Sequence, residues 1–220
     1  MLVAGGDVWK GRWVFVLLHD GRFQEALVVR EFESAMPSLE LAVVIAVDIP
    51  IGLPEPGRRR GADEQARLYV GPRWPSVFLA PSADLLAAES TRAANLIART
   101  SASSGISAQT FALKRAIAEV AAVAERDPRI HEAHPEVSFV AANDEQHLSW
   151  PKATWNGWCL RRRILERRGV AIPDDLGSAG GAGAPDVLDA AAVAWTAARI
   201  ASGTARRMPE VDDGAGAIWR

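Results

Sequence analysis

The first part of the chain alternates short apolar runs with glycine and charged residues. Runs rich in Val, Leu, Phe and Trp occupy 1–6, 12–20 and 22–32, and an Asp-Gly pair at 20–21 separates the last two. Such runs are typical of strands, and Asp-Gly between them favours a hairpin because it tolerates positive φ in a two-residue turn. The pattern predicts three strands, of which the second and third are antiparallel neighbours.

A fourth run, "AVVIAVDI" at 42–49, is apolar at every position before Asp48. An apolar run without alternation indicates a strand that is covered on both faces. We therefore expect this strand to lie in the middle of a sheet. The stretch 33–41 before it is long enough for a helical turn or two.

From residue 61 the chain becomes rich in alanine, and its apolar residues recur with helical spacing. The predicted helices are 61–70, 83–99, 108–126, 155–169 and 186–201. A further extended piece is predicted at 128–139, a loop at the Ser-rich 100–107, and a flexible linker at the Gly-rich 177–185.

This order of elements predicts an α/β fold with one mixed five-stranded sheet and helices on both of its faces. If the first three strands form an antiparallel meander, the fourth must cross over and lie beside the first, parallel to it, with the fifth strand beyond. We expect one domain over 1–210, with a loop-rich and helical elaboration at about 50–127 and a C-terminal tail at 211–220.

The composition narrows the functional classes. The 220 residues carry a net charge of −2, so no overall positive field attracts nucleic acid or membrane. Cys159 is the only cysteine, which excludes an internal disulfide and a thiolate zinc site. No apolar stretch is long enough for a membrane span, and the N-terminus lacks the features of a signal peptide. We expect a cytoplasmic protein.

Acidic residues lie at the ends of predicted strands and at the start of the last predicted helix. Asp7 follows the first apolar run, Asp48 ends the fourth, and Glu136 follows in "HPEVSF". Asp186 and Asp189 open the last helix at a spacing of three, so they share a face. Ligands of open α/β sheets gather beyond the carboxyl ends of strands where the topology switches, here between the first and fourth strands.

Several carboxylates at one rim would repel each other, and a divalent cation removes that penalty. Oxygen ligands without cysteine suit Mg²⁺ or Mn²⁺. Each acid also has a structural explanation: Asp186 as a helix cap, Asp7 as a turn former, and Glu136 as a surface acid. Asp48 is harder to explain in this way, because a carboxylate that ends a buried strand needs a partner.

Six blocks carry a family resemblance when they are taken together. They are "GGDVWKGRWV", "VDIPIGLPE", "RRRGADEQARLYVGPRWPSVFLAP", "SAQTFAL", "EAHPEVSF" and "DVLDAAAVAWTAAR". In this order they resemble the domain of unknown function 429 family, predicted nucleases with a ribonuclease H-like fold, over roughly residues 3–210. Val8, Arg12 and Ala62 depart from the family pattern, and Trp74 with its neighbours replaces part of a serine pair. None of these departures removes an acid.

The resemblance implies a fold and a site. In the ribonuclease H-like superfamily the metal-binding acids lie on the first strand, on the fourth strand and at the start of the last helix. These places correspond to Asp7, Asp48 and Asp189, with Asp186 and Glu136 as supporting acids.

The leading hypothesis is two-metal hydrolysis of phosphodiester bonds in RNA or DNA, with Asp7, Asp48, Glu136 and Asp189 as catalytic acids. Arg73, Lys152 and Arg161 are candidate contacts to the substrate phosphate. Each of these three cations is explained equally well by an ordinary ion pair on a helix or the surface.

Two other classes stay open. Actin-like kinases and ATPases share this sheet topology, and "GGDVWKGRW" is similar at a distance to their phosphate loop, although such enzymes need a second half and a longer chain. A non-catalytic binding or regulatory module could also keep the fold, but the full set of acids argues against the loss of catalysis.

Overall fold

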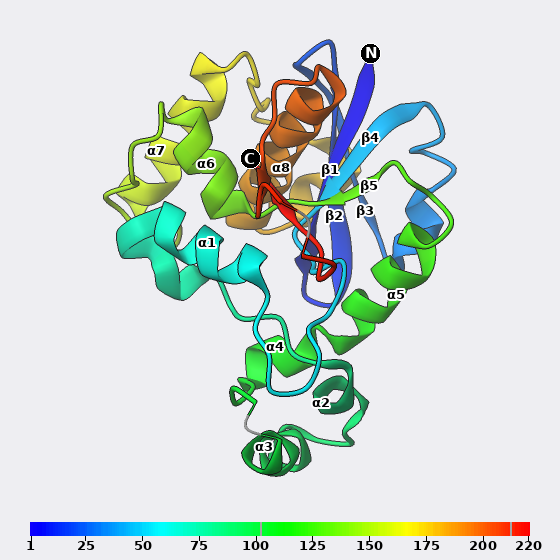
Figure 1. Cartoon of the computed structure of the whole chain (residues 1–220). Coiled ribbons are helices and arrows are strands. Elements are labelled where there is room, and N and C mark those ends of the chain that lie inside the picture. Colours follow the sequence, from blue (N-terminus) through cyan, green and yellow to red (C-terminus); the bar gives the residue numbers. More distant parts are fainter. Residues whose placement is uncertain (102, 212) are drawn as a thin grey trace.

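The structure, a computed structural model, describes residues 1–101, 103–211 and 213–220. Its central sheet has the strand order β3-β2-β1-β4-β5, in which β1 pairs with β2 and β2 with β3 antiparallel, and β1 with β4 and β4 with β5 parallel. The strands are β1 (Leu2–Trp9), β2 (Arg12–His19), β3 (Arg22–Val29), β4 (Ala42–Val47) and β5 (Ile130–Glu132). The predicted mixed sheet is confirmed, with β4 crossing over to the free side of β1 (Figure 1).

Helices fill the connections between the strands. The α-helices are α1 (Gly61–Val70), α2 (Ala83–Ala87), α3 (Thr91–Thr100), α4 (Ala108–Ala112), α5 (Lys114–Ala124), α6 (Pro135–Ala142), α7 (Trp155–Arg167) and α8 (Ala184–Ala201). Short 3₁₀ helices are η1 (Phe32–Ala35), η2 (Gly71–Ser76) and η3 (Gly177–Gly181). A small second sheet pairs β6 (Arg207–Met208) with β7 (Ile218–Trp219).

Both faces of the sheet are covered, which explains why β2 is apolar at every position from Trp13 to Leu18. Val14 and Val16 pack in one core with α8, while Phe15 and Leu17 pack in a second core with α5 and η1. Helix α8 is buried almost all round its middle, as expected of a helix without a polar face. Figure 1 shows α8, α6, α7 and α1 on one side of the sheet and α5 on the other.

Gly5 allows α8 to lie directly against β1. A Cβ atom at Gly5 would stand 2.2 Å from the carbonyl oxygen of Ala190 and 2.2 Å from the backbone nitrogen of Ala194. Only glycine therefore permits this backbone approach. The contact fixes the first half of α8 over the strand that carries Asp7.

Two of the predicted helices are each divided in two. The prediction of one helix at 83–99 was wrong, because the chain leaves helical geometry at Ala88 and restarts as α3, where the Ser90 hydroxyl accepts from the Ala93 N–H. The helix predicted at 108–126 is interrupted at Leu113, whose N–H bonds back to Thr110 in a tight last turn of α4. The predicted loop at 100–107 is irregular at 103–107, and residue 102 lies outside the described residues.

The extended piece predicted at 128–139 is a strand only over β5. Pro135 begins α6, and the Nδ1 atom of His134 accepts from the Glu136 N–H at the start of that helix. All eight residues of α6 are buried. A helix buried on every side has no amphipathic period, so its sequence cannot be distinguished from that of a buried strand by pattern alone.

The linker and the tail are more ordered than the sequence indicates. The Gly-rich stretch at 177–185 contains η3 and the start of α8. In the predicted tail, of which residue 212 lies outside the described residues, Trp219 pairs with Arg207 and bridges to Ala133. In the described part of the chain, no helix is long and apolar enough to cross a membrane.

Candidate active site

Two of the predicted acids are neighbours on the same face of the sheet. Asp48 follows β4 directly, and its N–H donates to the Gly6 carbonyl oxygen at 3.0 Å, which continues the parallel pairing with β1 up to Asp7. Val3 and Val44, four positions before each aspartate, both pack in the core with α8. Because side chains alternate along a strand, Asp7 and Asp48 also face α8.

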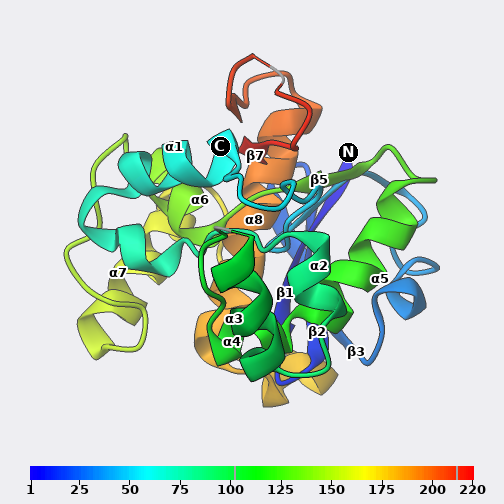
Figure 2. The ribbon, with the colours of Figure 1, turned by 60° about the horizontal axis from the view of Figure 1, so that its bottom comes forward.

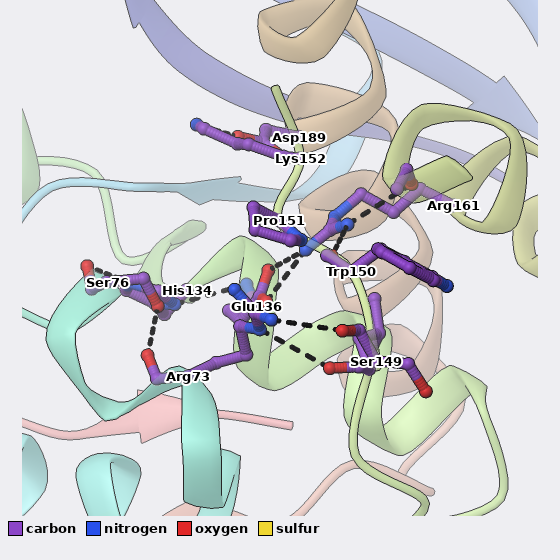
Figure 3. A network of polar contacts seen from close by, with 12 residues as sticks. Arg73, Ser76, His134, Glu136, Ser149, Trp150, Pro151, Lys152, Arg161 and Asp189 are labelled. Atoms are coloured by element: carbon purple, nitrogen blue, oxygen red, sulfur yellow. Dashed lines mark hydrogen bonds and ion pairs between the residues drawn. The ribbon is translucent and has the colours of Figure 1, made fainter. Parts of the chain in front are cut away.

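Helix α8 brings a third carboxylate to this place. Asp189 is 2% exposed and lines a cleft of about 380 Å³ together with Asp7, Asp48, Asp186 and Lys152. The Nζ atom of Lys152 lies 2.5 Å from one oxygen, Oδ2, of Asp189 (Figure 3). The other oxygen, Oδ1, is buried and has no hydrogen-bond partner in the described part of the chain. The topology therefore joins carboxylates that are distant in sequence.

The electrostatics of the cleft favour neutral carboxyl groups. Burial, with repulsion from Asp48 and Asp189, raises the pKa of Asp7 well above its usual range. Burial likewise raises the pKa of Asp48, and it raises that of Asp189 to about 6. Burial works against the Lys152 ammonium, but attraction to Asp189 outweighs it and raises the pKa of Lys152. The single positive charge of Lys152 therefore does not neutralise the three carboxylates when all of them are ionised.

Glu136 and Arg161 form a buried ion pair. The Nη2 atom of Arg161 donates to both carboxylate oxygens of Glu136, at 2.7 and 2.6 Å, and the two residues are 1% and 5% exposed. Glu136 still lines the cleft, but both of its oxygens already accept from the guanidinium. Arg161 was predicted to contact the substrate phosphate. In this structure its guanidinium instead binds the carboxylate of Glu136.

The same arginine and Arg73 hold the segment that carries Lys152. Arg161 Nη1 donates to the Trp150 carbonyl oxygen at 3.0 Å. Arg73 Nε and Nη2 donate to the carbonyl oxygens of Leu148, at 3.3 Å, and Ser149, at 3.2 Å. Figure 3 shows these bonds side by side below Lys152. Glu136, Arg161 and Arg73 therefore act on the backbone before Lys152, and Lys152 is the predicted cation that reaches the carboxylates.

His134 joins the wall of the cleft to α6. Its Nδ1 accepts from the Glu136 N–H at 3.2 Å, which leaves Nε2 to donate to the Ser76 carbonyl oxygen at 3.3 Å. The imidazole is 9% exposed. It is thus a structural link between η2 and α6 at the edge of the cleft.

Sequence reasoning missed a buried network behind the site. Arg60 Nη2 donates to both oxygens of Glu132, at 2.7 and 2.8 Å, and Arg60 Nη1 donates to the Gly52 carbonyl oxygen. Glu132 also accepts from the Ile51 N–H at 2.7 Å. These bonds fix the turn that follows Asp48. In the sequence, nothing distinguishes Arg60 from the adjacent Arg58 and Arg59, and only the fold shows that Arg60 is the buried one.

The elaboration at 50–127 supplies the remaining wall of the cleft. Lining residues from the segment around η2 and from α4 with its flanks are Pro75, Ser76, Phe78, Ser107, Gln109, Thr110 and Leu113. Helices α2 and α3 lie beside α4, which forms part of this wall (Figure 2). The insertion therefore converts an open sheet edge into a cleft.

The donor set suits a hard divalent cation in chemistry, although it is not arranged as a formed metal centre. Within 1–101, 103–211 and 213–220, no three His, Cys, Asp or Glu side chains are spaced as a group that could hold a metal ion. The acids nevertheless offer only oxygen, they exceed the positive charge beside them, and Oδ1 of Asp189 has no partner. Asp7, Asp48 and Asp189 thus fit Mg²⁺ or Mn²⁺ by donor type and charge.

Comparisons with known proteins identify a family for nearly the whole chain. No curated protein and no solved structure gives a significant match. A family model described as "Protein of unknown function (DUF429)" matches residues 5–214, which include the end of β1, all of β4 and α8, and hence all the acids of the cleft. The chain therefore belongs to the DUF429 family.

Proposed function

We propose that this protein is a metal-dependent nuclease with a ribonuclease H-like fold, which hydrolyses phosphodiester bonds at the acidic cleft. The observation that carries the proposal is the meeting of Asp7, Asp48 and Asp189 in one cleft with a single lysine beside them. Two buried carboxylates, Asp7 and Asp189, and the partly buried Asp48, with one lysine beside them, are unfavourable for a structural site. They are what a site for divalent cations requires.

The topology supports the fold assignment. A meander of three antiparallel strands is followed by two parallel strands, and the acids lie on the first strand, directly after the fourth strand and in the last helix. These are the three places that the superfamily resemblance implies. The order of the strands and the positions of the acids therefore both support the proposed ribonuclease H-like fold.

Asp7, Asp48 and Asp189 would hold the cation. Asp7 Oδ1 accepts from the Val8 N–H at 2.7 Å, and Asp189 Oδ2 accepts from Lys152, so each has a second oxygen that no bond in the described residues engages. The chemistry that Mg²⁺ or Mn²⁺ supplies when bound is activation of a water and neutralisation of charge on the phosphate. The carboxylates are also the groups that can accept the proton of an attacking water.

Lys152 would contact the substrate phosphate. Its side chain is 49% exposed, so the ammonium is open to the cleft while it touches Asp189. A cation that enters the site would compete with Lys152 for Asp189. A substrate phosphate would compete with Asp189 for Lys152. Glu136, Arg161 and Arg73 position the backbone from which Lys152 extends and have no direct part in the chemistry.

The test is cleavage of labelled single-stranded RNA, single-stranded DNA, RNA–DNA hybrid and branched DNA, each with Mg²⁺, Mn²⁺ or chelator. We expect metal-dependent cleavage of at least one substrate, its loss in the double variant Asp7→Asn/Asp189→Asn, and its retention in Glu25→Gln/Glu125→Gln, which removes two exposed acids elsewhere. Equal cleavage by the two double variants would contradict the proposal. Nucleotide hydrolysis without any nucleic-acid cleavage would favour the phosphoryl-transfer alternative.

A further inference from the structure

A second pocket lies behind the wall of the acidic cleft. It has a volume of about 260 Å³ and is formed by the segment after η2, the loop before α4, and arginines on and before α1. Four residues line both hollows: Pro75, Phe78, Ser107 and Thr110. The pocket and the cleft are therefore immediate neighbours that share one wall, on the side where α2, α3 and α4 gather (Figure 2).

The chemistry of this pocket is opposite to that of the cleft. Its polar lining residues are Arg58, Arg59, Arg67, Ser82, Ser103, Ser104, Ser107 and Thr110, and no Asp or Glu is among the lining residues. Arginines and hydroxyl groups are donors to anions, and guanidinium groups match phosphate oxygens in geometry. A neutral or cationic ligand would find few acceptors here.

The arginines are only partly engaged. In the described residues, the exposed Arg58 side chain makes no hydrogen bond or ion pair, and its backbone N–H donates to the Glu55 carbonyl oxygen at 3.0 Å. Arg59 lies 3.7 Å from Glu64, and both of these side chains are more than half exposed. Arg67 donates its Nε–H to the Val77 carbonyl oxygen at 2.8 Å and lies over the ring of Trp74. That contact fixes Arg67 at the rim, while Arg58 and Arg59 keep donors for a ligand.

Ser82 is the second, independent sign of a ligand. It lines the pocket and is 3% exposed, yet its Oγ has no hydrogen-bond partner among the residues that the structure describes. Ser82 precedes α2 in the position of a cap, but its hydroxyl does not bond to the helix. Buried hydroxyl groups in proteins are nearly always paired, so an unpaired one in the lining of a cationic pocket indicates a missing acceptor.

We propose that this pocket binds a phosphate group of the substrate, next to the phosphate that is cleaved. The inference rests on the proposed function for the identity of the substrate as a nucleic-acid strand, but the anion site itself does not. A volume of about 260 Å³ is below the roughly 300–1,000 Å³ of pockets for whole small molecules, which suits one phosphate and its waters. A strand crossing the shared wall would place one phosphate at the acids and another at Arg58.

The anion site is tested with inorganic phosphate in chelator at constant ionic strength, by calorimetry. We expect one binding site in the wild type, weakened about tenfold by Arg58→Ala and several-fold by Ser82→Ala. Arg22→Ala, which removes an exposed arginine on the edge strand β3, is the matched control and should bind as the wild type does. No binding, or equal affinity in all four proteins, would overturn the proposal.

Thermal melts separate a binding role from a structural one. Ser82→Ala removes a buried hydroxyl without a partner, so its melting temperature should equal or exceed that of the wild type while phosphate affinity falls. A lowered melting temperature with unchanged affinity would show that Ser82 is structural.

The source of the phosphate is tested with a short labelled single-stranded DNA in chelator, with and without a 5′-phosphate. If Arg58→Ala weakens only the phosphorylated form, the pocket holds a terminal phosphate. If it weakens both, with a salt slope lower by about one, the pocket holds an internal phosphodiester. If Arg58→Ala changes the affinity for neither DNA, the pocket does not bind a phosphate of a nucleic-acid strand, and this part of the proposal is overturned. Because no hydrolysis is measured, failure of the nuclease proposal leaves these results unchanged.

Discussion

Asp189→Asn should stabilise the protein in metal-free buffer, and more so as the pH rises. Burial raises the pKa of Asp189 to about 6 from an ordinary value of 3.8. The folded protein therefore holds this proton more tightly than the unfolded chain does. Stability from the protonated form is fully present below the unfolded pKa and is lost as the pH rises through the folded pKa.

The size of the effect follows from these two values. At pH 8 the ionised carboxylate costs the folded state about 3 kcal/mol relative to a neutral group, and at pH 5 about 2 kcal/mol. Asparagine has the same shape and no charge, and the half-exposed Lys152 can be solvated when its partner is lost. The stabilisation by Asp189→Asn should therefore grow by about 1 kcal/mol between pH 5 and pH 8.

Urea unfolding in chelator at pH 5, 6, 7 and 8 measures this growth, with the fluorescence of the eight tryptophans as the signal. The change with pH is the decisive quantity, because it cancels constant differences between aspartate and asparagine. Asp175→Asn, an exposed acid in the segment before α8, is the control and should show a much smaller dependence on pH. Repeating the series with Mn²⁺ should stabilise the wild type and leave Asp189→Asn nearly unchanged.

A destabilised variant, or a difference that does not vary with pH, would refute this reasoning. Either result would mean that the ion pair with Lys152 outweighs burial and that Asp189 is a structural partner. The uncompensated charge on which the metal proposal rests would then be absent at this residue.

Three further predictions concern other parts of the molecule. Gly5→Ala should prevent normal packing of α8 and lower stability by several kcal/mol in urea unfolding, whereas Gly180→Ala, which meets nothing within 4 Å, should change it by less than about 0.5 kcal/mol. Glu136→Gln should cost about 3–5 kcal/mol because it leaves the Arg161 guanidinium buried without its counter-charge; a loss below about 1 kcal/mol would contradict the ion pair. Asp48→Asn should weaken Mn²⁺ binding in calorimetry by more than tenfold while circular dichroism shows an intact fold, and unchanged binding would exclude Asp48 as a ligand.

The sequence alone determined the sheet and the place of three acids. Apolar runs, the Asp-Gly turn and the absence of alternation at 42–49 correctly predicted β1 to β4 and their order. Strand alternation and the crossover then bring Asp7 and Asp48 together, because parallel strands end at the same edge. These features are local or follow from topology, so a pattern of residues is enough to predict them.

Only the tertiary structure decided the roles of the charged residues around those acids. Glu136 looked like a free acid and Arg161 like a surface cation, but each is buried by packing of α6 against α7 and becomes the partner of the other. Arg60, in a run of three arginines, is likewise buried and is the partner of Glu132. Helix α6 was missed for the same reason, since burial on all sides removes the period that marks a helix. Burial and the choice of an ion-pair partner depend on elements far apart in the chain, and no local pattern records them.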